Sequence, residues 1–153
     1  MRLLDPLTFP SAGRTAANRV MFGPHVTNLG GDDRALPRRW VEYYAARAAG
    51  GCSLIVTEGA SVHPIDWPYE RAPLAERCGD GWSRAAARVH DHGSLLIASL
   101  DHAGGQGSSA YSQRELWAPS RVPEVNSREV PKWMEEEDIE AVIAGFAAGS
   151  FRC

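Results

Sequence analysis

Three short apolar runs, each ending near a glycine, constrain the fold of this chain most strongly. They are RVMF at 19–22, SLIVTEGA at 53–60 and SLLIASL at 94–100. Near-continuous apolar runs are typical of strands in a parallel sheet, which is covered on both faces. Amphipathic segments follow them at 36–50, 82–93 and 134–149, and a long polar stretch occupies 101–134. The order β-α-β-α-β-loop-α therefore predicts an α/β fold with helices packed on a parallel sheet.

Each predicted helix has apolar residues spaced to form one face. The first helix is expected to end at Gly50-Gly51 and the second at Gly93, because glycine commonly ends a helix. The last begins with acidic residues, which complement the positive end of a helix dipole. The expected core-facing residues are Trp40, Tyr44, Ala45 and Ala48 in the first helix, Trp82, Ala85, Ala86 and Val89 in the second, and Ile139, Val142, Ile143, Phe146 and Ala147 in the third.

The residues just past each predicted strand differ from ordinary loop sequence. They are Gly23-Pro24-His25, Glu58-Gly59-Ala60 and the glycine-rich segment 101–105. In α/β proteins the carboxyl ends of parallel strands form the edge where ligands bind. Glycine lets a bulky group approach the backbone, and proline fixes the direction in which the chain leaves the strand. We therefore expect a binding site at this edge.

Composition excludes several classes of protein. The chain of 153 residues has a net charge of -3 with both signs interspersed, so it does not resemble a nucleic-acid or anionic-membrane binder. No apolar run approaches the length of about 18 residues that a membrane span needs, and the first ten residues lack the apolar core of a signal peptide. Three cysteines without CxxC spacing favour reduced thiols. We expect a cytoplasmic protein with a small-molecule substrate.

Several spaced motifs together resemble the amino-terminal part of the old yellow enzyme and 2,4-dienoyl-CoA reductase family. They are LLDPLTF, ANRVMFGPH, YYAARAAGGCSLIVTEGASVHP, DHAGGQG and WAPS. GPHVTNLG, DWPYERAPL and HAGGQGSSAYSQ further resemble the branch associated with the mycofactocin redox system. The resemblance implies an FMN-dependent (β/α)8 TIM barrel that takes a hydride from NAD(P)H onto flavin N5 and passes it to an acceptor such as an activated alkene or enoyl compound.

The resemblance also implies roles for individual residues. Those expected to contact the FMN ring are Pro24, His25, Val26, Gly59 and Ser99, and those expected on the substrate side are Thr27, Asn28 and His102. Val26 stands where many relatives have Thr or Cys, Ser99 where Gln is usual, and Gly105 where Arg is usual. These departures are expected to alter the tuning of the flavin and the choice of substrate.

The length of the chain predicts a partial barrel. A complete (β/α)8 barrel takes about 250 residues, whereas residues 1–153 hold about three βα units, ending after the helix that follows the third strand. The loops that hold the FMN phosphate, and any iron-sulfur cluster, are expected only in a full-length relative. Open sheet edges would favour self-association. The alternative to an active oxidoreductase is a catalytically silent fragment or assembly module.

Two side chains are candidates for catalysis, and each has a second interpretation. Glu58 is either a general base at a strand end or a polar residue that orients the adjacent loop. Tyr111 is either a proton donor or an aromatic residue that packs in its loop. His25, His102, Glu58 and Asp101 have the chemistry of zinc ligands but no tight spacing, so we expect no metal. A metal-dependent hydrolase is a distant third hypothesis.

Overall fold

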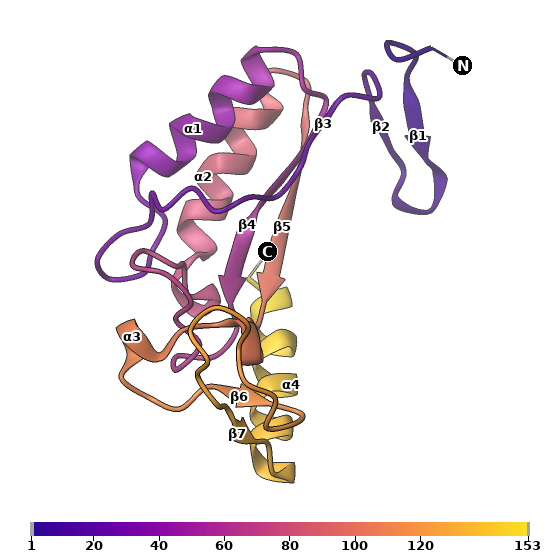
Figure 1. Cartoon of the computed structure of the whole chain (residues 1–153). Coiled ribbons are helices and arrows are strands. Elements are labelled where there is room, and N and C mark those ends of the chain that lie inside the picture. The colour runs from indigo at the N-terminus through magenta and orange to yellow at the C-terminus, as the bar shows by residue number, and fades with distance from the viewer. Residues whose placement is uncertain (1, 153) are drawn as a thin grey trace.

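The computed structural model describes residues 2–152, and its centre is a three-stranded parallel sheet (Figure 1). The strands are β3 (Met21–Phe22), β4 (Leu54–Ser61) and β5 (Leu95–Asp101), in the order β3-β4-β5. Two helices, α1 (Arg38–Ala49) and α2 (Gly79–His90), lie side by side against one face. The predicted α/β fold with parallel βα units is confirmed.

The core lies between these two helices and the sheet. Trp40 and Tyr44 of α1 are fully buried, as are Val89 of α2 and Ile55 of β4. The Trp40 and Tyr44 rings pack with centroids 4.5 Å apart. The predicted apolar faces of both helices therefore pack where the sequence placed them, and burial of their aromatic area stabilises this layer.

The other face of the sheet is open. Phe22, Leu96 and Ala98 pack against the helical core, and successive side chains of a strand point to opposite faces. Met21 and Ile97 consequently face away from the helices, and they are 56% and 46% exposed. An uncovered apolar face of this kind corresponds to the interior of a barrel.

Two element boundaries differ from the prediction. The run at 19–22 forms a strand only at Met21–Phe22. Just before the regular ladder, the Val20 carbonyl accepts the backbone N–H groups of both Ser53 and Leu54. Helix α2 begins at Gly79, three residues before the predicted start. A Cβ on Gly81 would lie 2.3 Å from the Leu36 side chain, so this first turn depends on a close tertiary contact.

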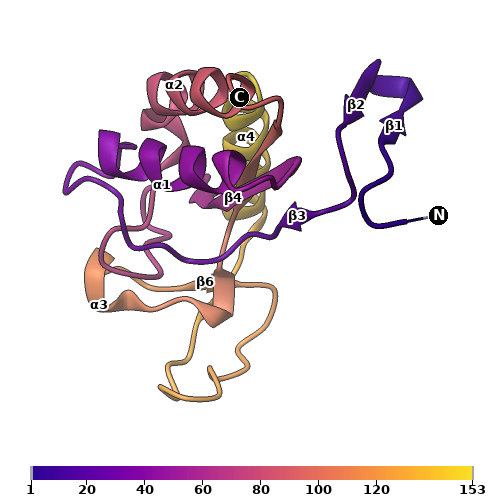
Figure 2. The same cartoon turned by 90° about the horizontal axis from the view of Figure 1, so that it is seen from above.

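A short hairpin precedes the sheet and was not predicted. Strands β1 (Leu7–Phe9) and β2 (Arg14–Ala16) pair antiparallel around the 3-10 turn η1 (Pro10–Ala12). Gly13 closes that turn with a φ of 60°, a conformation that glycine adopts without strain. The hairpin stands apart from the sheet in both views (Figures 1 and 2).

The segment 101–134, expected as a loop, contains short elements. They are η3 (Gly104–Gln106), α3 (Ser109–Ser112), β6 (Trp117–Ala118) and β7 (Lys132–Trp133). Strands β6 and β7 pair in parallel, and flanking bonds from Lys132 N to Leu116 O and from Met134 N to Ala118 O extend the ladder. Strands of two residues carry no readable periodicity, which is why the sequence did not predict them.

Helix α4 (Glu136–Ser150) packs through a face of small residues. Gly145 and Gly149 allow it to approach Val62 and Leu100 closely. The predicted apolar face is instead largely exposed, with Ile139 at 46%, Ile143 at 55% and Phe146 at 38%. The helix is therefore where it was predicted, but most of the face expected to be its packing face is uncovered. Glu135 and Asp138 form a capping box at the start of this helix. A further 3-10 turn, η2, spans Ala75–Arg77.

Candidate functional site

The carboxyl ends of β3, β4 and β5 meet at one edge of the sheet, where the predicted ligand site lies. Gly59 and Ser99 are directly paired across β4 and β5, as are Ser61 and Asp101. Ser99 points toward the open face, on the same side as Ile97. The segment Pro24 to Val26 follows β3, the other neighbour of β4, and is exposed. Residues from all three strand ends are thus present at this edge.

The residues predicted to contact the ring after β3 have surfaces free for a ligand. Val26 is 56% exposed, and Pro24 is also exposed. His25 is held by a 2.7 Å hydrogen bond between Nε2 and the Tyr43 hydroxyl, and its ring packs edge-on against Phe22 at 5.2 Å. The imidazole is therefore oriented by α1 and β3 rather than free to rotate.

The side chain of Asp101, on the neighbouring strand β5, requires glycine at position 59. A Cβ at this position would lie 2.7 Å from the Asp101 Cβ, closer than real contacts allow. The Asp101 side chain thus occupies the space where a side chain at position 59 would lie. Gly59 was predicted to offer its backbone to a cofactor, and the structure adds a packing reason for glycine that the sequence did not reveal.

Glu58 is the most highly connected side chain of the site. It is 2% exposed, and its carboxylate accepts hydrogen bonds from Trp40 Nε1 at 2.7 Å, the Tyr69 hydroxyl at 2.8 Å, Thr27 N at 3.1 Å and the Thr27 hydroxyl. Its backbone N–H donates to the Tyr44 hydroxyl at 2.7 Å. Four donors on two oxygens support the interpretation that Glu58 orients the adjacent segments, and they leave little room for general-base chemistry.

The backbone N–H and the hydroxyl of Thr27 both donate hydrogen bonds to Glu58. Its hydroxyl donates to that carboxylate and also accepts from Leu29 N at 3.1 Å. The predicted substrate contact through this hydroxyl would have to replace one of these bonds. The position of Thr27 thus fits a support for the segment better than a direct contact.

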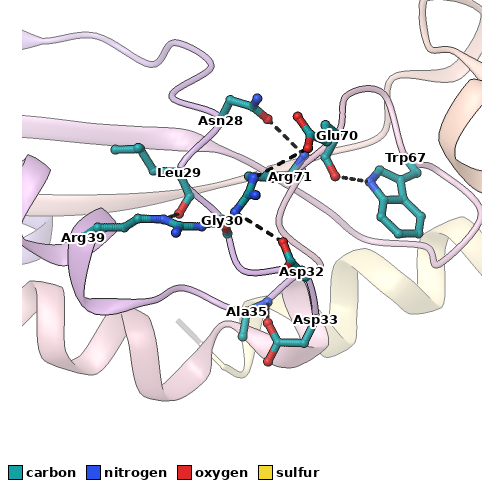
Figure 3. A network of polar contacts seen from close by, with 10 residues as sticks. All are labelled: Asn28, Leu29, Gly30, Asp32, Asp33, Ala35, Arg39, Trp67, Glu70 and Arg71. Atoms are coloured by element: carbon teal, nitrogen blue, oxygen red, sulfur yellow. Dashed lines mark hydrogen bonds and ion pairs between the residues drawn. The ribbon is translucent and has the colours of Figure 1, made fainter.

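Asn28 joins two loops at the same edge, as Figure 3 shows. It has a φ of 54°, and its Oδ1 accepts from Arg71 N at 3.0 Å. Arg39 donates to the Leu29 carbonyl at 2.9 Å and to the Gly30 carbonyl (Figure 3). The side chain predicted to face a substrate therefore has its acceptor occupied by backbone, while its Nδ2 group is available.

Asp66 ties the loop after β4 to the glycine-rich turn after β5. It is 4% exposed, and both carboxylate oxygens lie 3.2 Å from Ala103 N. Burial raises the pKa of this carboxyl, and the charge of the nearby His102 acts in the opposite direction to a smaller extent. Asp66 therefore fixes the backbone next to His102, the third residue predicted on the substrate side.

Arg34 closes the loop that carries Asp66. Although 4% exposed, it donates to three backbone carbonyls, those of Ala72 at 2.9 Å, Pro64 at 2.9 Å and Asp66 at 2.8 Å. Its guanidinium also lies 4.7 Å from the Trp67 ring centroid. Burial lowers the pKa of Arg34. Sequence reasoning missed Arg34 and Asp66, because nothing in the local pattern distinguishes them from loop residues.

A pocket of about 870 Å³ opens beside His102. It lies between the turn at 102–106 and the segment 117–126, with Trp117 and Met134 in its wall. Tyr111 lies on α3, is 45% exposed, and is outside the lining of this pocket. Its predicted role as a proton donor gains no contact that supports it and stays a prediction.

The zinc alternative gains no support from the geometry. Among residues 2–152, no group of three or more His, Cys, Asp or Glu side chains is arranged to hold a metal ion.

In the same part of the chain, no helix is both long enough and apolar enough to cross a membrane.

Comparison with known proteins gives one consistent family. Residues 2–153 match the sequence profile of the NADH:flavin oxidoreductase / NADH oxidase family. The chain is 30% identical over 142 residues to an NADH oxidase of Thermoanaerobacter brockii, covering 88% of this chain and 21% of the relative. It is 31% identical over 159 residues to a multifunctional alkene reductase/demethylase of Caballeronia cordobensis, covering 99% and 23%.

Solved structures establish the fold independently. A 2-naphthoyl-CoA reductase complex superposes with a TM-score of 0.89 at 20% identity, covering 98% of this chain and 25% of that one. An old yellow enzyme homologue from Zymomonas mobilis gives 0.84 at 24% identity, covering 98% and 44%. The chain thus matches the amino-terminal part of these barrels. It spans 17% to 44% of the length of the curated relatives.

Proposed function

Because this chain belongs to the NADH:flavin oxidoreductase / NADH oxidase family, we propose that it contributes the ring-binding edge of an FMN-dependent NAD(P)H oxidoreductase of the old yellow enzyme type. The observation that carries the proposal is the pairing of Gly59 with Ser99 beside the exposed segment 24–26, at the carboxyl edge of a parallel sheet with an open inner face. That edge is where α/β barrels bind their ligands.

The residues at this edge fit a flat ring in chemical terms. Pro24 and Val26 offer exposed apolar surface, and nothing lies within 4 Å of where a Gly23 side chain would begin. Ser99 adds a hydroxyl on the open face. When bound, FMN would accept a hydride from NAD(P)H and pass it to an acceptor. This chain would hold and orient the ring through 24–26, Gly59 and Ser99, with His102 beside the acceptor.

The motif resemblance extends the proposal to the acceptor, the branch of the family and the cellular location. An activated alkene or enoyl compound is the proposed acceptor class. GPHVTNLG and DWPYERAPL support the mycofactocin-associated branch. A cytoplasmic location agrees with the thiol content, and an iron-sulfur cluster is proposed only for a full-length relative.

Flavin titration of the purified chain tests the proposal. In TIM barrels the phosphate is commonly held by loops after strands seven and eight, and the described strands match the amino-terminal part. We therefore expect Kd values above about 1 μM, and riboflavin should bind within about threefold of FMN, because the ring supplies the contacts. Val26→Glu should weaken both, whereas Leu4→Glu, at an exposed position ahead of the amino-terminal hairpin, should not. No saturable binding of either flavin would overturn the proposal.

A catalytically silent assembly module is the second candidate. It is favoured by the exposed apolar face of α4, where Ile143 is 55% exposed. NADH or NADPH oxidation with saturating FMN and an enone acceptor separates the two. Turnover above the rate of free flavin supports the oxidoreductase, and flavin binding without turnover supports the silent module.

A further inference from the structure

A β-bulge interrupts the ladder between β4 and β5 at the ligand edge. Val56 pairs with Ile97 and Gly59 pairs with Ser99, so β4 has two residues where β5 has one. The two residues of the bulge, Thr57 and Glu58, are both buried, which breaks the alternation of inward-facing and outward-facing side chains along the strand. Bulges of this kind redirect side chains and occur often beside functional sites.

Thr57 replaces a backbone acceptor that the bulge removes. It is fully buried, and its Oγ1 accepts the Ser99 backbone N–H at 3.1 Å while donating to the Glu58 carbonyl at 3.0 Å. Ser99 would otherwise have a poorly paired N–H in the middle of the sheet edge. The position of Ser99 on the open face therefore depends on a hydroxyl from the neighbouring strand.

Glu58, the second residue of the bulge, points toward α1 and connects three segments. Its carboxylate holds Trp40 of α1, Tyr69 of the following loop, and both the amide and the hydroxyl of Thr27. The Thr27 bonds fix the end of the exposed segment that begins at Pro24. One bulge thus sets the position of chain on both sides of β4.

We infer that the β4 bulge is the positioning device of the ligand edge, with Thr57 fixing Ser99 and Glu58 fixing the segment 24–27. Both are positioning residues, because neither side chain faces the open edge. The inference concerns local geometry in this chain, and it rests on the proposed function only where it names a flavin ring as the group that these segments meet.

The hydrogen bonds of Thr57 and Glu58 predict what happens when each is replaced by a side chain of similar shape. Thr57→Val keeps the shape but removes the acceptor for Ser99 N, whereas Thr57→Ser keeps it. In Glu58→Gln, the side-chain NH2 group must face either Trp40 Nε1–H or Thr27 N–H. These two groups can only donate a hydrogen bond, whereas the two hydroxyls can also accept one. One N–H is left without an acceptor in either orientation. An unsatisfied buried N–H raises local opening by about tenfold or more.

Amide hydrogen exchange on the whole chain, with and without FMN, tests the inference. We expect Ser99 to exchange about tenfold faster in Thr57→Val, with Thr57→Ser restoring protection, and either the Thr27 amide or the Trp40 indole N–H to exchange faster in Glu58→Gln. Val89→Ala is the control: it removes core volume in α2 and should lower overall stability without a selective effect at Ser99 or Thr27. Unchanged protection at Ser99 in Thr57→Val would overturn the inference.

The flavin spectrum separates positioning from general loss of stability. In Thr57→Val, the visible absorption of bound flavin should shift and its Kd should rise about tenfold, and Thr57→Ser should restore both. A Val89→Ala chain that reproduces this shift would count against the inference. If the unmodified chain binds no flavin while Ser99 responds selectively to Thr57→Val and the Thr27 amide or Trp40 indole to Glu58→Gln, the proposed function fails and the positioning role stands.

Discussion

The indole of Trp40 donates a 2.7 Å hydrogen bond to the carboxylate of Glu58, which joins the first helix to the end of the central strand. Both residues are buried, so the bond is shielded from water and the carboxylate depends on it. Hydrogen bonds to charged groups contribute about 1.5–3 kcal/mol.

Trp40→Phe should therefore lower the free energy of unfolding by more than the loss of ring area alone. We expect about 2 kcal/mol beyond the effect of Trp82→Phe, which removes the same ring area from the same core without touching the donors of Glu58. Urea unfolding followed by circular dichroism measures both. Equal losses in the two variants would mean that the bond contributes nothing net.

Arg34 should be intolerant of lysine. Its guanidinium reaches three carbonyls at once, and a lysine ammonium cannot reproduce that planar arrangement. We expect Arg34→Lys to destabilise the chain by about 2–4 kcal/mol and to speed proteolytic cleavage within residues 62–73. Arg38→Lys, at a side chain that is 92% exposed, should change neither. Wild-type cleavage rates in Arg34→Lys would contradict this role.

The sequence predicted the helical layer well because local spacing determines it. Trp40 and Tyr44 recur at the interval that puts them on one face, and Val89 does the same with Trp82. The early start of α2 was not predictable, since Gly79 and Gly81 are poor helix formers. Gly81 packs closely against Leu36, 45 positions earlier by their residue numbers, and such a tertiary contact leaves no local pattern.

The edge formed by the strand ends was predicted, but the contacts that support it were not. Strand ends are visible in the sequence, so the edge around Gly59 and Ser99 could be located. The bulge at Thr57 was not, because a continuous apolar run does not show which residue is extra. Asp66 and Arg34 act on backbone groups 37 and 38 residues away, and such partners leave no local pattern.

Gly59→Ala should destabilise the chain through one neighbour. The new methyl would lie 2.7 Å from the Asp101 Cβ, and overpacking of this kind costs about 1–3 kcal/mol. In an Asp101→Gly background the same substitution should be nearly neutral. Thermal unfolding of the four variants in this double-mutant cycle measures the coupling. Additive effects would show that Asp101 does not impose glycine at position 59.

Asp66 should make stability fall as pH rises. Burial raises the pKa of its carboxyl in the folded chain above the ordinary value of 3.8, despite the opposing charge of His102. The folded state therefore binds the proton more tightly than the unfolded state. This contribution is full below the ordinary pKa and is lost as pH rises through the raised one.

Asp66→Asn removes the titration while keeping an oxygen for Ala103 N. The unfolding free energy of wild type minus that of the variant should thus decrease as pH rises above the ordinary pKa of 3.8. Urea titrations at several pH values supply the difference. A difference that increases with pH would mean that the pKa is lowered in the folded chain.

The exposed apolar face of α4 should drive self-association of this chain. Ile139, Ile143 and Phe146 recur on one side of the helix at 46%, 55% and 38% exposure, and contiguous apolar surface of this kind favours association. We expect a concentration-dependent rise in sedimentation coefficient at about 10–100 μM, corresponding to a weak contact of small area.

Ile143→Asn should shift that rise to higher concentration by about tenfold, because it places an amide at the centre of the face. Glu137→Gln is the matched control, since it changes an exposed side chain off the face and should leave the sedimentation profile unchanged. If both variants associate like wild type, the contact lies elsewhere, and the unpaired edge of β5 becomes the surface to alter next. A monomer at all concentrations in the unmodified chain would show that the uncovered face of α4 does not associate under these conditions.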